Sequence, residues 1–472
     1  MKYPVLIDSC VRGAGDDIYL HTYKNGHEFS IERIHADILN LCDGNYSLYD
    51  ISKNVNLTVE EITDFLNVLE EGRLLKYNTS ARQEVNFNWS DNPPFLREVH
   101  IDITGSCNLF GKCKHCYARS NLQNSQKDEL TTSELINLID QMGEMNVADC
   151  VISGGEPFLR EDLPQIIKRL SANKIHLIGL FTNGTVYREE IFKTLKEENY
   201  KTFFFISLDG YDAETHEFMR GKGTFDKTIK FIEKVNEFGF PVIINTMVTK
   251  QNVNSLMEFC HFLETKNINR WRLTVPREQG EAVFHKNLIM PEWDDVFTSY
   301  TELLKYCLVK KTSMKVQIGS IFKSELIDEP EYYLYNDDNS CCEYKRWSIV
   351  VKPNGNVTPC TAFDNLVLGN IKEKKLSDIW YSEITQSVKN LPIKLTECKD
   401  CKIRKYCGGG CRKIAWELHG DCFAKDDNSC PLYEFAAEVA QPILAQHGIK
   451  ALTLKKPKEY KYNYMDIPNH IK

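Results

Sequence analysis

The sequence predicts an α/β protein built around a parallel sheet, with a small module before the sheet and a cysteine-rich region after it. Apolar strand-like runs alternate with amphipathic helix-like runs over residues 96–280, the rhythm of a parallel sheet with crossover helices. A polar linker at 78–95, which contains Pro93 and Pro94, separates residues 1–77 from the rest. The third observation is that many of the 17 cysteines lie in tightly spaced groups.

The composition argues against nucleic-acid-wrapping, membrane-spanning and exported classes of protein. A net charge of −8 argues against a surface that wraps nucleic acid. No apolar run approaches the length of a membrane span, and charged residues come too early for a signal peptide. We therefore expect a cytoplasmic protein, whose cysteines serve metal binding or catalysis rather than disulfides. Five cysteines in apolar surroundings are expected to be packed thiols: Cys10, Cys42, Cys150, Cys260 and Cys307.

Residues 1–77 are predicted to form a module of short strands followed by helices. The strands are expected at 5–9, 18–23 and 28–31, and Thr58-Val-Glu-Glu61 is a capping box that opens a helix. This order resembles a winged helix. Its charges are mixed and no basic recognition helix is visible, so the module favours a peptide-binding variant that adds a leader strand to its exposed sheet edge.

The central region predicts six strand–helix repeats, an open (β/α)6 partial barrel rather than a full eight. The strands are expected at 98–103, 149–153, 175–181, 202–208, 241–247 and 270–275, and the helices near 132–145, 162–172, 188–197, 225–238 and 253–265. Beyond them we expect a helical bridge over 281–338, a cysteine-rich domain over 339–447 and a surface tail over 448–472.

A loop with three cysteines, Cys107, Cys113 and Cys116, follows the first predicted strand. Thiolates are the soft ligands that hold zinc or iron–sulfur clusters. Three local ligands leave one metal position open, which suits a metal that binds a substrate or cofactor better than one with a purely structural role. The alternative is a structural zinc loop whose fourth ligand comes from elsewhere, such as His115.

The next strands also end in chemically unusual residues, at the edge where parallel sheets gather functional groups. The second ends in Gly154-Gly155-Glu156, the third in Thr182-Asn183-Gly184 and the fourth in Ser207-Leu-Asp209. Paired glycines allow close backbone approach to a ligand, and Glu156 can accept from an ammonium. Ser207 and Asp209 suit ribose hydroxyls. Each motif is weak alone, but their order is a strong signal.

Residues 96–280 resemble the radical S-adenosylmethionine (SAM) superfamily. The resemblance implies that the three loop cysteines hold a [4Fe–4S] cluster whose open iron binds the methionine amino and carboxylate groups of SAM. The SAM-binding residues that it implies are His115, Gly154, Gly155, Glu156, Asn183, Ser207, Asp209 and Arg220.

Within this set, His115 is expected near adenine. Arg220 is a weaker candidate for the SAM carboxylate, with a surface cation as the alternative. One departure from the family is that five residues, not three, separate Cys107 from Cys113. Gly111 makes such a longer loop feasible.

A second cysteine group lies near the hairpin-turn signal at 353–356. Its members are Cys342, Cys360, Cys398, Cys401, Cys407, Cys411 and Cys430. A zinc ribbon is the alternative, but seven cysteines exceed the needs of one zinc. The spacing resembles the SPASM extension with two auxiliary [4Fe–4S] clusters. That resemblance implies an inner set of Cys342, Cys360 and Cys411, and an outer set of Cys398, Cys401, Cys407 and Cys430. The fourth inner ligand stays open between Cys341, Cys422 and an open iron where a substrate thiolate could bind.

Together the three parts resemble maturases of ribosomally made peptides, especially the thioether-forming sactipeptide and ranthipeptide types. The resemblance implies SAM and three [4Fe–4S] clusters as cofactors. It also implies two partners, a precursor peptide whose leader binds the N-terminal module and a flavodoxin- or ferredoxin-type electron donor. The rival is another radical SAM–SPASM activity, such as carbon–carbon crosslinking or sulfatase maturation. A zinc-dependent winged-helix regulator is a distant alternative.

Overall fold

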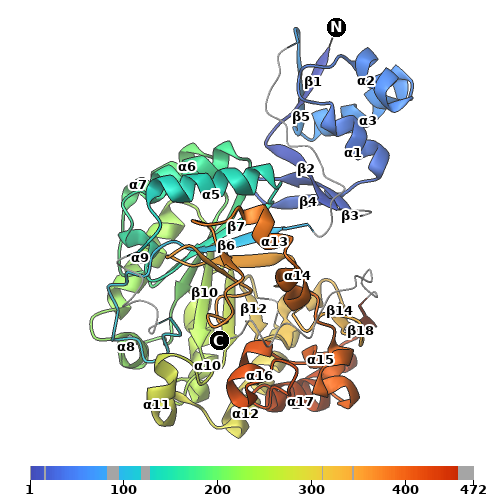
Figure 1. The fold of residues 1–472 in the computed structure, drawn as a ribbon. Helices are drawn as coiled ribbons and strands as arrows, with labels where there is room; N and C mark the ends of the chain where they lie inside the picture. The colour runs from blue at the N-terminus through green and yellow to red at the C-terminus, as the bar shows by residue number, and fades with distance from the viewer. Residues whose placement is uncertain are drawn as a thin grey trace.

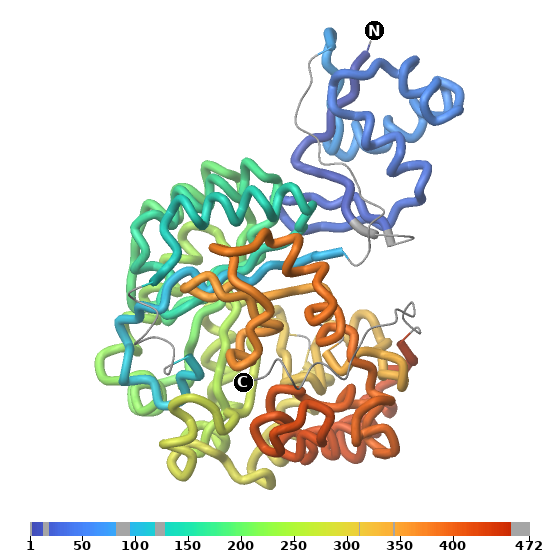
Figure 2. The backbone as a smooth tube through the Cα atoms, viewed as in Figure 1, coloured from blue at the N-terminus to red at the C-terminus, as the bar shows by residue number. Residues whose placement is uncertain are grey.

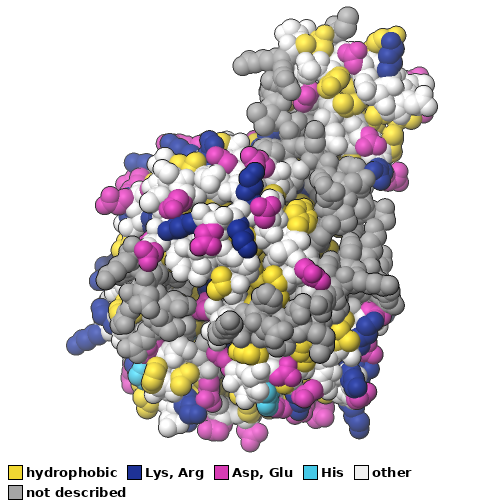
Figure 3. All heavy atoms as spheres, viewed as in Figure 1, with side chains coloured by type: hydrophobic (Ala, Val, Ile, Leu, Met, Phe, Trp, Pro, Cys, Tyr) yellow, Lys and Arg dark blue, Asp and Glu magenta, His cyan; other side chains and the backbone are white. Residues whose placement is uncertain are grey.

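The computed structural model describes residues 2–14, 17–81, 95–118, 128–310, 312–342 and 345–454. Figures 1 and 2 show a small N-terminal module set against one end of a larger α/β body. Among the helices in these ranges, none is long and apolar enough to cross a membrane. On the face shown in Figure 3, Lys and Arg side chains are interspersed with Asp and Glu.

The N-terminal module combines two small sheets with three helices. Strand β1 (Tyr3–Leu6) pairs antiparallel with β5 (Leu75–Asn78). A second antiparallel sheet has the order β2-β3-β4. Its members are β2 (Ser9–Ala14), β3 (Asp17–Thr22) and β4 (His27–Ser30). The helices are α1 (Arg33–Asn40), α2 (Leu48–Val55) and α3 (Val59–Glu71). These elements bury an apolar cluster of their own, separate from that of the main body.

The capping box predicted for α3 is confirmed. The Thr58 hydroxyl accepts from the Glu61 N–H, and the Glu61 carboxylate accepts from the Thr58 N–H at 2.8 Å. Strands β2 and β5 were not predicted, because Ser-Cys-Val-Arg-Gly-Ala and Leu-Lys-Tyr-Asn carry little strand signal.

All six predicted barrel strands are present and parallel, and no end differs from its prediction by more than one residue. They are β6 (Glu98–Asp102), β7 (Asp149–Ser153), β8 (His176–Thr182), β9 (Phe203–Ser207), β10 (Val242–Met247) and β11 (Arg270–Thr274). The predicted helices are α5 (Thr132–Glu144), α6 (Leu163–Ala172), α7 (Glu189–Glu197), α9 (Phe225–Glu237) and α10 (Leu256–Glu264). Helix α8 (Ala213–Arg220) is an addition. It carries Arg220 at its last residue.

The sheet continues beyond the six predicted strands. On one side β12 (Lys315–Ile318) pairs parallel with β11, followed by β13 (Phe322–Lys323). On the other side β15 (Ser348–Val351) pairs parallel with β6, followed by β16 (Asn356–Thr358) and β17 (Gly369–Asn370). The region predicted as a helical bridge therefore contains strands after α11 (Glu281–Ile289) and α12 (Trp293–Val309). Four-residue strands such as β12 are too short for a reliable periodicity.

The C-terminal region is mostly short helices around the second cysteine group. They are α13 (Leu376–Trp380), α14 (Glu383–Lys389), α15 (Arg404–Cys407), α16 (Arg412–His419), α17 (Cys430–Phe435) and α18 (Gln441–Gln446). A π-helical segment, Ala436–Ala440, joins the last two. The predicted tail begins instead with β18 (Lys450–Thr453), which pairs with β14 (Glu331–Leu334). The rest of that tail, and most of the predicted linker, lie outside the described residues.

Candidate functional site

The loop with Cys107, Cys113 and Cys116 begins shortly after β6, and its three thiols are half-buried. Gly111 has φ +71°, and apart from its chain neighbours no atom of the described residues lies within 4 Å of where a Cβ would stand. The longer spacing between the first two cysteines is thus absorbed by a left-handed turn at an open position. Burial raises the pKa of Cys107 to about 12, so a metal must displace its proton.

The spacing of the thiols is wider than a single zinc ion requires. A tetrahedral Zn²⁺ with bonds of about 2.3 Å holds its sulfurs roughly 3.8 Å apart. Within the described residues, the cysteines form no group of three whose sulfurs all lie within 4.8 Å of one another. The donor set fits a larger iron–sulfur cluster, which thiolates also ligate.

The paired glycines after β7 allow close approach to the root of the cysteine loop. A Cβ on Gly154 would lie 2.3 Å from the Thr104 carbonyl oxygen, and one on Gly155 would lie 2.1 Å from that of Ser106. The Gly155 N–H donates to the Thr104 carbonyl at 2.7 Å. The glycines therefore fix the loop against β7, whatever contact they make with a ligand.

The Glu156 carboxylate is fully buried and has partners of its own in the protein. It accepts from the Thr182 hydroxyl at 2.9 Å and from the Asn183 N–H at 2.8 Å. Burial raises its pKa to about 7. These bonds tie the end of β7 to the end of β8 and use part of the carboxylate's capacity to accept hydrogen bonds.

The Asn183 side chain lies beside the first cysteine. Its amide donates to the Asn108 side-chain oxygen at 2.9 Å and lies 4.0 Å from the Cys107 sulfur. Its own side-chain oxygen accepts from the Thr185 N–H at 2.8 Å. Asn108 is a loop residue that the sequence did not single out. The one feature of the sequence that could have identified it is its position between Cys107 and Cys113.

The Arg220 guanidinium is largely buried and fixed by neighbouring side chains, so it is not a surface cation. Its Nε donates to Asp209 Oδ2 at 2.6 Å, and one terminal nitrogen lies 3.2 Å from His115 Nε2. Because the guanidinium can only donate, it assigns the proton of a neutral His115 to Nδ1. Burial, together with the Arg220 charge, lowers the pKa of His115 to about 4 and keeps its ring neutral.

The two predicted ribose residues lie in different environments. Ser207 is half-buried at the end of β9. Asp209 is fully buried, with one oxygen on Arg220 and the other accepting from the Met247 N–H at 2.8 Å. Burial opposes its charge, yet Arg220 holds the pKa of Asp209 below its ordinary value. A ribose hydroxyl at this carboxylate would share it with Arg220 and the Met247 N–H.

The predicted outer cysteine set is brought together. Cys398, Cys401, Cys407 and Cys430 line one small cavity, together with Gly409 and Gly410. Both glycines have positive φ, +80° and +77°, which lets the chain turn tightly beside the sulfurs.

The predicted inner set, Cys342, Cys360 and Cys411, lies next to a buried lysine. Burial raises the pKa of Cys342 to about 12, and the charges of Cys411 and Cys360 add to this shift. Lys389 Nζ donates to the Pro359 carbonyl at 2.5 Å and to that of Lys345 at 2.9 Å. Burial lowers its pKa to about 8. The set therefore carries a cation that the sequence did not reveal.

The two further candidates for the inner set point elsewhere. Cys341 is buried, and its sulfur lies 3.3 Å from where a Cβ on Gly409 would stand, on the loop of the outer set. Cys422 is buried in the apolar core. Neither position identifies a fourth inner ligand.

A cavity of about 270 Å³ with mixed polar and apolar walls adjoins the cysteine loop. Lys352 lies on its wall, 3.2 Å from Asp102 and 2.7 Å from Asp364. Lys352 directly follows β15. Sequence reasoning missed it because nothing indicated that β15 pairs with β6.

Comparison with known proteins identifies two domains in the chain. The sequence pattern of the radical SAM superfamily matches residues 101–263. The iron-sulfur cluster-binding domain called SPASM matches residues 341–402.

Two curated relatives and one solved structure extend the comparison. The chain is 27% identical over 346 residues to the AdoMet-dependent heme synthase of Methanosarcina barkeri, covering 69% of this chain and 93% of that protein. It is 26% identical over 363 residues to the antilisterial bacteriocin subtilosin biosynthesis protein AlbA of Bacillus subtilis, covering 73% and 74%. Streptococcus suis SuiB bound to the precursor peptide SuiA shares its fold, with a TM-score of 0.65 and 19% identity over 91% of this chain and 100% of that one. Residues 101–263 are thus a radical SAM domain and residues 341–402 a SPASM domain, as the cysteine motifs predicted.

Proposed function

We propose that the chain installs thioether crosslinks in a ribosomally made precursor peptide, between a cysteine sulfur and a carbon of an acceptor residue. The observation that carries the proposal is the inner cysteine set. The Cys342 thiol interacts there with those of Cys360 and Cys411, and two of the three lie near the Lys389 cation. Cys422 lies in the apolar core, and Cys341 lies beside Gly409 in the loop of the outer set. Three protein ligands leave a cluster position at which a substrate thiolate can bind, and the nearby cation favours that anion.

The donor sets on this chain are assigned by the same proposal. Cys107, Cys113 and Cys116 hold the SAM-binding [4Fe–4S] cluster, and the inner and outer sets hold two auxiliary clusters. When bound, the first cluster and SAM supply the reductive chemistry that removes a hydrogen atom from an unreactive C–H bond. Asn108 and Asn183 fix the first cysteine, and Asp209 sets the direction of Arg220 toward the SAM carboxylate.

The N-terminal module supports a peptide substrate. Within the described residues β4 pairs with β3 alone, and its side chains are largely exposed. An exposed edge strand is a template for an added peptide strand. SuiB, whose fold this chain shares over most of its length, was crystallised with a precursor peptide. AlbA, by its name, acts in the biosynthesis of a bacteriocin.

Mass spectrometry of the product tests the reaction. Anaerobically reconstituted enzyme is incubated with SAM, a flavodoxin-type reductant and a cysteine-rich peptide encoded beside the gene. Each crosslink should remove two hydrogen atoms, one from the acceptor carbon and one from the thiol. The cysteine should then resist alkylation. A product that loses two hydrogens but keeps an alkylatable thiol would show carbon–carbon crosslinking instead.

Strand addition can be tested at one position of β4. The Ile31 N–H donates to the Ile18 carbonyl of β3. Alternation along the strand therefore turns the Ser30 N–H to the free edge. Ser30→Pro removes this donor and should weaken leader binding roughly tenfold, whereas Ser30→Ala keeps it. Equal leader affinity for both variants would contradict binding at this edge.

The module's other role, raising the local concentration of the core peptide, predicts that deletion of residues 1–77 spares SAM cleavage but slows precursor turnover.

A further inference from the structure

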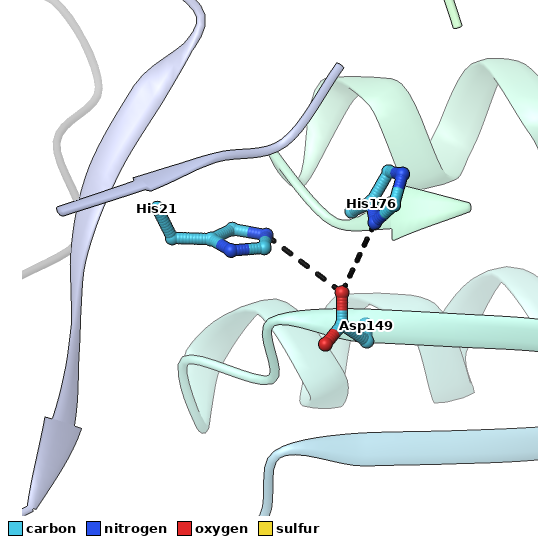
Figure 4. Close-up of side chains that lie close together, drawn as sticks. All are labelled: His21, Asp149 and His176. Carbon is cyan, nitrogen blue, oxygen red and sulfur yellow. Dashed lines mark hydrogen bonds and ion pairs between the residues drawn. The ribbon is translucent and has the colours of Figure 1, made fainter. Parts of the chain in front are cut away.

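Three metal-ligating side chains meet where the N-terminal module contacts the barrel. His21 comes from β3 of the module, while Asp149 and His176 are the first residues of β7 and β8 (Figure 4). Their ligand atoms all lie within 4.8 Å of one another. His176 Nδ1 is 3.1 Å and His21 Nε2 is 3.8 Å from the same oxygen of Asp149. The cluster lies at the opposite ends of the strands from the cysteine loop.

The separations fit one metal ion. Bonds of about 2.0–2.2 Å from a tetrahedral Zn²⁺ to imidazole and carboxylate place neighbouring donor atoms roughly 3.3 Å apart. The two measured separations, 3.1 and 3.8 Å, lie on either side of that value. Two imidazoles and one carboxylate form a ligand set that suits zinc and other divalent transition metals.

Both histidines are buried, and only one of their four ring nitrogens, His176 Nδ1, has a hydrogen bond of good geometry within the described residues, to the Asp149 carboxylate at 3.1 Å. His21 has 0% and His176 has 5% of its surface exposed. Within the described part of the chain, neither ring nitrogen of His21 nor Nε2 of His176 has a hydrogen-bond partner of good geometry. Buried polar atoms nearly always have a partner. A bound metal ion would provide a partner for His21 Nε2.

The surroundings of the cluster are also those of a metal site. His21 Nδ1, which faces away from Asp149, lies 3.2 Å from Glu28 Oε1, and a carboxylate behind a ligating histidine is common in metal centres. Arg97 binds Glu28 at 2.9 Å and the other oxygen of Asp149 at 3.2 Å. With neutral histidines, two carboxylates and one guanidinium sum to −1. This charge favours a cation.

We propose that His21, Asp149 and His176 bind a divalent transition metal ion, zinc in the first instance, which clamps the N-terminal module to the barrel. The site uses none of the cysteines, and its burial suits a structural role. The ion would join contacts that already bridge the two parts. Arg12 donates to the Asn146 side chain at 2.8 Å, and Lys24 donates to the Ser171 hydroxyl at 2.6 Å.

The test uses holoenzyme whose cysteines are already filled with iron, so that they do not capture zinc. The protein is dialysed anaerobically against buffered Zn²⁺, and its metals are measured by mass spectrometry. We expect about one zinc per chain in addition to the iron. His21→Gln and His176→Gln should each weaken zinc binding at least tenfold while the iron content stays unchanged. His27→Gln removes an exposed histidine from the neighbouring strand β4 and should leave zinc binding as it is.

X-ray absorption at the zinc edge of the unmodified holoenzyme gives a second readout that needs no variant. Nitrogen and oxygen neighbours with imidazole scattering would support the site. Sulfur neighbours, or no zinc uptake, would overturn it, as would full zinc binding by both histidine variants. The clamp also predicts that a chelator raises amide hydrogen exchange in β2–β4 and leaves exchange in β9 and β10 unchanged. This outcome does not depend on the peptide reaction.

Discussion

Replacing Asp209 with Asn tests how the proposed SAM site is assembled. The Asp209 carboxylate receives the Arg220 Nε–H at 2.6 Å and is fully buried. The substitution removes the charge but keeps the shape, so Arg220 loses its charged anchor and keeps its contacts with His115 and Cys113. A hydrogen bond to a charged group contributes about 1.5–3 kcal/mol. SAM should therefore bind roughly 10- to 150-fold more weakly.

The assay is equilibrium SAM binding to the anaerobic holoenzyme, with 5′-deoxyadenosine formation as the kinetic readout. Glu214→Gln, on the exposed first turn of α8, is the matched control and should have no effect. If Asp209 acts only through Arg220, the double variant Asp209→Asn/Arg220→Met should bind SAM no more weakly than Arg220→Met alone. Additive losses would instead favour direct contact of Asp209 with ribose. Unchanged affinity in Asp209→Asn would refute the anchoring role.

Three further predictions follow from the site. Changing Cys107, Cys113 and Cys116 together to Ala should abolish SAM cleavage and remove about a third of the iron; cleavage by this variant would show that another cluster binds SAM. Lys389→Met should lower the reduction potential of the inner cluster in an electron paramagnetic resonance titration, because a nearby cation is lost, whereas the exposed Lys399→Met should not. Because the pKa of Glu156 is raised from 4.5 to about 7, the folded state holds a proton that the unfolded chain releases. Its contribution to stability is thus present below pH 4.5 and lost as the pH rises through 7, by up to about 3 kcal/mol; Glu156→Gln should flatten the pH profile of the melting temperature between pH 5 and 8.

The barrel could be predicted from the sequence because each of its strands is an apolar run between clear helices. The order of motifs at the strand ends likewise located the cysteine loop and its neighbours. Strands β12 and β15 could not be predicted in this way. They have four residues each and join the sheet through pairing that is remote in sequence.

The chemistry of individual side chains was harder to predict than their position. Glu156 and Asp209 occupy the predicted strand ends, but their carboxylates bind Thr182 and Arg220 of the protein itself. How deeply a side chain is buried and which way it points depend on tertiary packing, which a short sequence motif does not encode. The contacts of His21 with Asp149 and His176 are a stronger case, since they link residues more than a hundred positions apart.

The position of the N-terminal module sets a minimum distance between the bound leader and the first residue that can be modified. Its strand β3 contacts the barrel through His21, beside His176 where β8 begins (Figure 4). Strand β8 ends at Thr182, and the next residue, Asn183, contacts the cysteine loop. Seven extended residues cover about 23 Å. On the proposed function, a precursor held at β4 must therefore place at least about seven residues between its bound segment and its first modified residue. Shorter spacers would keep the leader affinity but leave the nearest cysteines out of reach, so the first crosslink would move toward the C-terminus of the peptide.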